Sequence, residues 1–302
     1  MNRVAVLMST YNGEKFLQEQ IESILSQKDV ELTLYIRDDG SLDRTIDIID
    51  DYNKKHPNIC FTKGNNVGVG NSFMQLVYKA PTDYDYYAFA DQDDIWLSEK
   101  LSKAISILKK KNTPYLYCSN QSLVDKELNS LGKRYKQTPD TSYMQILCNN
   151  KITGCTMVWN NALNTLIRDE NRRPDSALLR NRIHDVWVAM VASVVGEIYF
   201  DMDSYIKYRQ HDNNVVGARK KTLYNDITEK IGKLFNPNER NGRSLLAKAI
   251  YRLYGEYIAE QEVLIDSAYY NKIALVKDVS IIARYSGETY FGLILKVLLG
   301  LY

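Results

Sequence analysis

Apolar and polar positions in the first 120 residues alternate between two periods. Short apolar runs such as Val4–Ser9 are typical of strands that are buried on both faces of a parallel sheet. Between these runs, apolar residues recur at helical spacing, as Ile21, Ile24 and Leu25 do. The pattern predicts strands at residues 4–9, 32–37, 59–62, 86–90 and 115–118, and helices at residues 14–27, around 46–52, at 71–79 and at about 98–108, the last with Ser98 as its N-cap.

Such an alternation of strands and helices indicates an α/β fold with an open, mainly parallel sheet and right-handed crossovers. Ligands of these sheets bind beyond the carboxyl ends of the strands. The middle of the chain is less regular. After a polar stretch at residues 125–139, the pattern predicts a strand at Gly154–Trp159, an apolar helix at His184–Val195 and a strand at Ile198–Tyr208.

The character of the chain changes after residue 218. Between Arg219 and Arg252, nine Lys or Arg residues stand against three Asp or Glu, and amphipathic helical segments follow. The last segment, Phe291–Tyr302, is apolar except for Lys296. A solvated helix face explains such charge clusters, and so does attachment to an anionic leaflet, in which the apolar end would lie in the interface. Packing on the rest of the chain or on a second copy, as a homodimer, is a further alternative.

Composition narrows the protein class. The chain has 302 residues, of which 45% are hydrophobic and 25% charged, which excludes disordered and fibrous proteins. The formal net charge of +2 argues against a bulk nucleic-acid binder. Four cysteines stand far apart without a C-x-x-C pair, which favours reduced buried thiols over disulfides or a zinc site. We see neither a signal-peptide pattern nor an apolar run of about 20 residues, and we therefore expect a cytoplasmic location.

Polar clusters follow the first two predicted strands. Residues 9–14 (STYNGE) suit a strand-to-helix turn that presents backbone N–H groups to a ligand, although Ser, Asn and Gly are common in any such turn. Asp38 and Asp39 end the second strand. Two adjacent carboxylates there are costly, because their negative charges repel, unless they bind a ligand or another group. An aspartate there can accept the ring N–H of a pyrimidine base. Capping of the next helix accounts for Ser41 or Asp43, but it does not require all three aspartates at positions 38, 39 and 43.

The strongest cluster is Asp91-Gln92-Asp93-Asp94, which follows the strand at residues 86–90. If the segment is extended, Asp91 and Asp93 point to the same side, because side chains alternate along a strand. One carboxylate can reach a ribose hydroxyl while the other holds a hard divalent cation, Mg²⁺ or Mn²⁺, together with a diphosphate.

The order of STYNGEKF, RDDGSLDRT, GNNVGVGNSF and ADQDDIW resembles the inverting family-two nucleotide-sugar glycosyltransferases. The resemblance covers about residues 3–215 and implies a GT-A fold, with a nucleotide-binding part at about residues 1–120, an acceptor part at about 121–218 and a helical C-terminal region at 219–302. By matching positions, it places these residues at the nucleotide sugar: Thr10, Tyr11, Glu14, Asp39, Asn66, Gly68 and Asp91. It implies that Asp93 binds the metal.

Later motifs extend the resemblance. His184-Asp185 stands where the family has its catalytic base, usually written E-D or D-D, and the histidine variant is similar to a bacterial rhamnosyltransferase-like branch. The resemblance implies that Asp185 deprotonates the acceptor hydroxyl, that Arg209 meets the diphosphate and that His211 is a further metal ligand. The processive signature Q-x-x-R-W is absent, which favours addition of a single sugar.

These features together predict a metal-dependent inverting glycosyltransferase. Our first choice of donor is dTDP-rhamnose, with a UDP-linked hexose or N-acetylhexosamine as the main competitor, and the acceptor would be a saccharide or a polyprenyl-linked precursor of a cell-surface polysaccharide. We expect no nucleic-acid partner. A nucleotidyltransferase is a second hypothesis, but residues 9–16 lack the basic Gly-rich phosphate loop that it would normally show. A catalytically inactive binding module is a third, against which Asp91, Asp93 and Asp185 argue.

Overall fold

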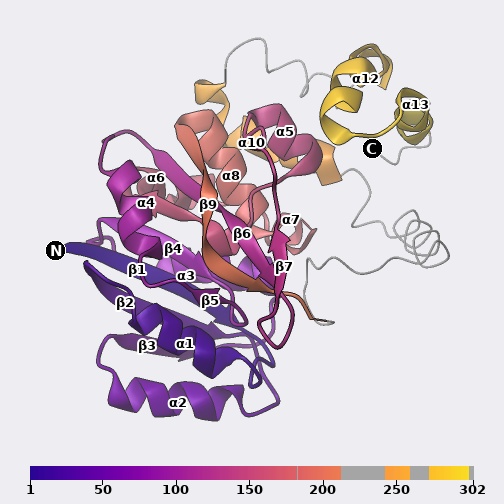
Figure 1. The fold of residues 1–302 in the computed structure, drawn as a ribbon. Coiled ribbons are helices and arrows are strands. Elements are labelled where there is room, and N and C mark those ends of the chain that lie inside the picture. Colours follow the sequence, from indigo (N-terminus) through magenta and orange to yellow (C-terminus); the bar gives the residue numbers. More distant parts are fainter. Residues whose placement is uncertain (182, 212–241, 259–271, 299–302) are drawn as a thin grey trace.

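The computed structural model describes residues 1–181, 183–211, 242–258 and 272–298. Its centre is a nine-stranded sheet with the order β3-β2-β1-β4-β8-β6-β9-β5, and β7 pairs with β6 (Figure 1). The strands are β1 (Asn2–Thr10), β2 (Val30–Asp38), β3 (Ile59–Lys63), β4 (Tyr86–Ala90), β5 (Ile95–Trp96), β6 (Tyr115–Val124), β7 (Ser130–Lys133), β8 (Val158–Asn160) and β9 (Glu197–Arg209). The helices of the first 211 residues are α1 (Leu17–Leu25), α2 (Thr45–Lys55), α3 (Val69–Lys79), α4 (Lys100–Leu108), α5 (Tyr143–Asn149), α6 (Asn161–Arg168), α7 (Ser176–Asn181) and α8 (His184–Val195).

The first half of the sheet is parallel and is buried on both faces. β1 pairs in parallel with β2 and with β4, and β2 pairs in parallel with β3. Along β1, Val4, Val6 and Met8 enter one hydrophobic cluster with α1, α2 and α4, whereas Ala5 and Leu7 enter the other cluster with α3, α6 and α8. This alternation follows from the two-residue period of a strand. An unbroken apolar run is therefore what a strand between two helical layers requires.

The second half of the sheet mixes directions. β8 runs antiparallel to β4 and β6, while the long strand β9 pairs in parallel with β6 through two register shifts. The short strand β5 then pairs antiparallel with the end of β9. This pairing brings the end of β9, at Arg209, beside the segment that follows β4.

The C-terminal helices lie against the second half of the chain. α10 (Gly242–Tyr254) buries Leu246, Ile250 and Tyr254 in the same cluster as α8. α12 (Lys272–Ser286) packs on α5, and α13 (Tyr290–Leu298) packs on α12 (Figure 1). The domain boundary that we expected near residue 218 lies outside the described residues and remains a prediction. No helix in the described part of the chain is long and apolar enough to cross a membrane.

The predicted α/β class, with a mixed and mainly parallel sheet, is confirmed. Two local expectations were wrong. Ser98 does not cap α4, because its hydroxyl contacts the Glu99 carboxylate and the cap position belongs to Glu99. The strand expected at Gly154–Trp159 begins as a 3₁₀ turn, Gly154–Thr156, and β8 starts only at Val158. The polar stretch at residues 125–139 contains the exposed strand β7, which the pattern did not predict.

Candidate active site

The polar residues singled out in the sequence gather where β1, β2, β4 and β9 end. Asp38 ends β2 beside Thr10 of β1, and the Thr10 hydroxyl donates to the Asp38 carboxylate at 3.1 Å. The same carboxylate accepts the backbone N–H groups of Gly40 and Ser41 at 3.0 and 2.8 Å. Asp38 therefore closes the turn after β2, and its oxygens accept hydrogen bonds from backbone and hydroxyl groups of the protein.

The turn after β1 is joined to the segment after β4. The Tyr11 N–H donates to Gln92 Oε1 at 2.9 Å, and Gln92 Nε2 donates to the Tyr11 carbonyl at 3.0 Å. Gly13 lies so close to Gln92 that an added Cβ would come within 2.3 Å of its side chain. The carboxylate of Glu14 accepts the Arg44 N–H at 3.0 Å, close to the start of α2. These contacts fix the turn and leave the Tyr11 ring exposed.

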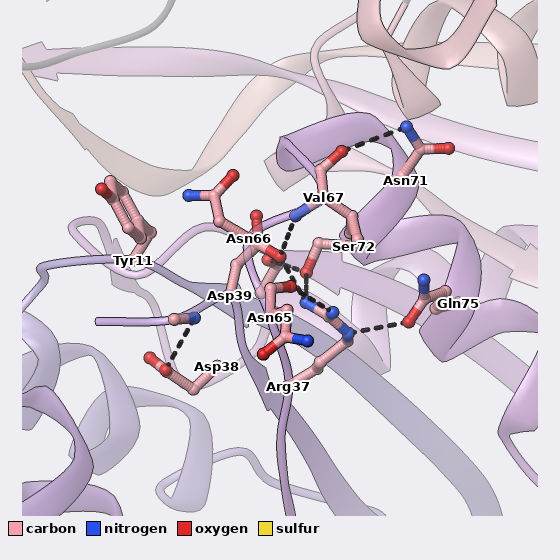
Figure 2. A network of polar contacts seen from close by, with 12 residues as sticks. Tyr11, Arg37, Asp38, Asp39, Asn65, Asn66, Val67, Asn71, Ser72 and Gln75 are labelled. Atoms are coloured by element: carbon pink, nitrogen blue, oxygen red, sulfur yellow. Dashed lines mark hydrogen bonds and ion pairs between the residues drawn. The ribbon is translucent and has the colours of Figure 1, made fainter. Parts of the chain in front are cut away.

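Asp39 joins β2 to the loop before α3 (Figure 2). Its carboxylate accepts from Arg37 at 2.6 Å, from the Val67 N–H at 2.9 Å and from the Gly68 N–H at 3.0 Å. Gly68 has a positive φ of 85°, a conformation that favours glycine, and its N–H also faces the Asn66 side-chain oxygen at 3.2 Å. The loop that carries Asn66 and Gly68 is thus held against Asp39.

An acidic cluster lies beyond β4. Carboxylate oxygens of Asp91 and Asp94 and the Cys155 sulfur all lie within 4.8 Å of one another. Burial, together with the charges of Asp93 and Asp185, raises the pKa of Asp91 to about 7. Burial also raises the pKa of Asp94 and that of the Cys155 thiol. The cluster therefore favours protonated groups unless a cation joins it.

The segment that carries Asp91 and Asp93 is not an extended strand. β4 ends at Ala90 and the chain bends at Gln92 and Asp93, so the alternation of an extended strand does not apply. Asp94, which is fully buried, lies close to Asp91, and one of its oxygens has no hydrogen-bond partner in the described residues. Lys100 is also fully buried, with its ammonium 3.3 Å from the centre of the Trp96 ring, and burial lowers its pKa to about 7.

The Asp93 side chain contacts His211, and Arg209 forms hydrogen bonds with Asp93 and Asp94. The Asp93 carboxylate lies 2.8 Å from His211 Nε2, and both side chains are largely but not fully buried. Arg209 has its backbone N–H on Asp94 at 3.1 Å, while its guanidinium donates to the Asp93 carbonyl at 3.0 Å. Two more N–H groups of the same guanidinium meet the Lys126 carbonyl at 2.8 Å and the Glu19 carboxylate at 2.5 Å. Arg209, which we expected at a diphosphate, is thus engaged by the protein itself.

Asp185 lies in the first turn of α8 and faces the acidic cluster. It is 7% exposed, and burial raises its pKa to about 6, although the N–H groups of Val186 and Gly154, at 2.7 and 3.3 Å, partly offset that rise. A carboxylate with such a pKa can take a proton near neutral pH. The preceding His184 is buried and stacks on Phe73 with ring centres 3.9 Å apart, and burial lowers its pKa to about 3. His184 is therefore a neutral packing group.

Sequence reasoning missed Arg134. This half-buried residue follows β7 and donates to the Gln121 side chain at 2.9 Å, and Gln121 in turn contacts Cys155 at 3.2 Å. Its positive charge lowers the pKa of Asp185, against the larger effect of burial. Arg134 lies in a polar segment with no recognisable motif, so only the tertiary structure reveals that it reaches the site.

Comparison with known proteins identifies the family. The profile of glycosyl transferase family 2 matches residues 5–166, more than half of the chain. The chain belongs to glycosyl transferase family 2. This glycosyltransferase is 32% identical over 223 residues to the dTDP-rhamnosyl transferase RfbG of Shigella flexneri, which covers 70% of this chain and 74% of the relative. It is 27% identical over 155 residues to the glucosyltransferase WfgD of Escherichia coli, named as acting from UDP-Glc on α-D-GlcNAc-diphosphoundecaprenol, across 51% of this chain and 58% of the relative.

Solved structures support the same fold for the glycosyltransferase. The structure of Staphylococcus aureus TarS residues 1–349 with UDP-GlcNAc has a TM-score of 0.56 at 16% identity and covers 100% of this chain and 93% of that one. The mannosyltransferase PcManGT of Pyrobaculum calidifontis, solved with GDP-Man and Mn²⁺, has a TM-score of 0.54 at 14% identity, across 99% of this chain and 81% of that one. The expected GT-A fold is therefore confirmed. Family membership also answers the nucleotidyltransferase and inactive-module hypotheses in favour of a glycosyltransferase.

Proposed function

We propose that the protein is a metal-dependent, inverting glycosyltransferase that moves L-rhamnose from dTDP-rhamnose to a saccharide or lipid-linked acceptor. The observation that carries the proposal is the position of Asp185, a buried carboxylate with a pKa raised to about 6, close enough to Asp91 for their charges to interact. A base of this kind beside a nucleotide-sugar site is what single displacement at an anomeric carbon needs. The similarity to a dTDP-rhamnosyl transferase supports the choice of sugar.

Asp93 and His211 fit the proposed divalent cation. Their ligand atoms lie 2.8 Å apart in a partly exposed position, beside the Asp91–Asp94 cluster, whose carboxylates interact with Asp93. Oxygen and imidazole nitrogen suit Mn²⁺, and carboxylates alone would suit Mg²⁺. The Cys155 thiol is a poor candidate, because its raised pKa keeps it protonated and a hard cation prefers oxygen. When bound, the cation would neutralise the charge of the leaving diphosphate.

The protein groups divide the remaining work. Asp39 and the loop of Asn66 and Gly68 receive the base, and Asp91 receives the sugar–nucleotide moiety. Asp185 takes the proton from the acceptor hydroxyl as that oxygen attacks the anomeric carbon, while the bond to the diphosphate breaks on the opposite face. Arg134 is linked to the acidic cluster by two hydrogen bonds, from its guanidinium to Gln121 and from Gln121 to Cys155. Its positive charge would take the role at the diphosphate that we expected for Arg209.

The donor is tested by thermal unfolding with Mn²⁺ and a panel of dTDP-, UDP- and GDP-sugars. A ligand that binds only the folded state raises the melting temperature, by an amount that grows with its concentration over its Kd. We expect the largest rise with dTDP-rhamnose. A larger rise with a UDP-hexose or a UDP-N-acetylhexosamine would transfer the proposal to that donor, and no rise with any nucleotide sugar would overturn it.

A surface on α12 and α13 supports the proposal of peripheral attachment to the inner face of the cell membrane. Phe291, Tyr290 and Leu295 of α13 are 77%, 53% and 48% exposed, and Ile281 of α12 is 45% exposed. An apolar face of this kind, with the exposed Arg284 on the same helix as Ile281, suits an anionic interface.

Sedimentation with anionic vesicles tests this attachment. We expect the double variant Phe291→Ser, Leu295→Ser to lose binding to phosphatidylglycerol vesicles, and Tyr251→Ser, which alters an exposed aromatic residue of α10, to keep it. The same vesicle binding by the double variant would contradict the proposal. A wild-type dimer that the double variant separates would assign the face to a second copy of the chain.

A further inference from the structure

A buried arginine lies beneath the proposed base site. Arg37 is the next-to-last residue of β2 and is 5% exposed. Burying a guanidinium is costly unless its donors are paired. Its Nη1 donates to Asp39 Oδ1 at 2.6 Å and to the Ser72 hydroxyl at 2.8 Å. Its Nε donates to Gln75 Oε1 at 2.9 Å, and its Nη2 donates to the Asn65 carbonyl at 3.0 Å (Figure 2).

These partners belong to three separate parts of the chain. Asp39 follows β2, Ser72 and Gln75 lie on α3, and Asn65 belongs to the loop between β3 and α3. A planar fork of five N–H donors can join such groups in one plane, and a lysine ammonium cannot reproduce that geometry. Arg37 therefore fixes the loop at residues 64–68 relative to both the strand and the helix.

The guanidinium also determines how the Asp39 oxygens are used. Asp39 Oδ1 is shared between Arg37 and the Val67 N–H, at 2.6 and 2.9 Å. Asp39 Oδ2 accepts the Gly68 N–H at 3.0 Å, and a carboxylate oxygen has capacity for a second donor. The arrangement directs one oxygen to the protein and leaves capacity on the other for a ligand N–H.

Gly64 shows how closely the loop meets the arginine. A Cβ added to Gly64 would come within 2.3 Å of Arg37 Nη2 and 2.6 Å of its central carbon. No positive φ is involved at this glycine, and the three atoms nearest to the added Cβ all belong to the Arg37 guanidinium, so this contact opposes alanine. The glycine is therefore needed for the close contact between the loop and Arg37.

We infer that Arg37 is a positioning residue for the nucleotide base: it holds the Asp39 carboxylate and the 64–68 loop in the arrangement that receives a base N–H. The inference rests on the proposed function. In this role Arg37 acts through Asp39 and the loop, since four of its five N–H donors bind protein groups. Its loss should therefore weaken recognition of the base and leave the phosphate end and the chemical step intact.

The test compares Arg37→Met, Arg37→Lys and Gly64→Ala with the wild type. Arg3→Met is the matched control. It removes an arginine that forms a salt bridge with Asp83 at 2.7 Å, and Arg3 lies at the amino end of β1, away from the proposed site. For each protein, calorimetry measures the Kd of dTDP and UDP and of inorganic diphosphate, all with Mn²⁺. Initial rates with the donor from the thermal screen separate KM from kcat.

We expect the Kd of dTDP and UDP and the donor KM to rise about 10- to 100-fold in Arg37→Met, the range for one lost hydrogen bond to a charged group. The diphosphate Kd and kcat should change little, and Arg37→Lys should recover only part of the loss. Gly64→Ala keeps the arginine and its charge but displaces the fork, so it should show the same split even if Arg37→Met fails to fold. Arg3→Met should match the wild type.

The outcomes separate this inference from the proposed function. If the wild type binds no pyrimidine nucleotide, the proposed function fails together with the inference. If the wild type binds dTDP or UDP and the folded Arg37 and Gly64 variants bind it equally well, only the inference is overturned. An equal loss of nucleotide and diphosphate affinity would also overturn it, because a collapsed site would weaken both.

Discussion

Replacing Asp185 by Asn should stabilise the metal-free protein while removing its activity. In the folded protein, burial raises the pKa of Asp185 to about 6 from an ordinary value of 3.8. That difference corresponds to about 3 kcal/mol at neutral pH, which the ionised carboxylate costs the folded state. Asn carries no charge, so the variant avoids this cost.

The new amide recovers only part of the difference, because one hydrogen bond is lost. The two Asp185 oxygens accept the N–H groups of Val186 and Gly154, and an amide offers a single acceptor oxygen. An unsatisfied buried donor costs about 1–3 kcal/mol. The Gly154 contact is long at 3.3 Å, so we expect the lower end of that range and a net gain of about 1–2 kcal/mol near pH 7.5.

The sign of the pH dependence distinguishes this account from a general effect of the substitution. A carboxyl whose pKa is raised on folding stabilises the folded state below its ordinary value of 3.8 and loses that contribution as the pH rises through about 6. The wild type should therefore lose stability relative to Asp185→Asn between about pH 4 and pH 7. Urea unfolding with a chelator, at about pH 5 and pH 7.5, measures the free energy of unfolding of both proteins.

Turnover completes the test. As a general base, Asp185 should contribute about 100- to 10,000-fold to kcat, and the wild-type rate should fall as the pH drops below about 6. Donor and Mn²⁺ binding should persist in Asp185→Asn. Unchanged turnover would refute the role as base, and a stability difference that does not grow with pH would refute the electrostatic reasoning.

Three further substitutions test the site. Asp93→Ala should abolish Mn²⁺-stimulated transfer with an unchanged circular dichroism spectrum, and full activity in this variant would remove the metal assignment. His211→Ala should weaken Mn²⁺ binding measured by calorimetry without changing donor binding in the absence of metal, whereas an unchanged Mn²⁺ affinity would exclude His211 as a ligand. Arg134→Met should lower kcat. It should also move the acidic limb of the pH–rate profile to higher pH, because the charge of Arg134 lowers the pKa of Asp185 in the wild type. An acidic limb at the same pH would place Arg134 outside the site.

Local pattern sufficed for the elements with a single strong period. The limits predicted for the strand Tyr86–Ala90 and the helix His184–Val195 match the structure. It failed where a segment is short or is stabilised by distant partners. β5 has two residues, and its strand partner β9 lies more than 100 positions later, so no local period predicts it.

The candidate site shows the same division between local pattern and distant contacts. Asp91, Asp93 and Asp185 could be singled out from motifs because their residue types stand at strand ends or a helix start. The closeness of Asp94 to Asp91 depends on the bend that follows β4. The engagement of Arg209 depends on Glu19 and Lys126, which the sequence gives no reason to bring near it.

The amino-acid sequence by itself determined the alternating α/β architecture, because burial between two helical layers demands apolar strands and one-sided helices. It also determined which acidic residues stand at the carboxyl edge of the sheet. Only the tertiary structure decided what each charged group does there, since charges and hydrogen bonds act between atoms a few ångströms apart, whatever their separation along the chain. The sequence does not distinguish the roles of three arginines, and only their hydrogen-bond partners do. Arg37 binds Asp39 at the base loop, Arg134 binds Gln121 beside the acidic cluster, and Arg209 binds Glu19.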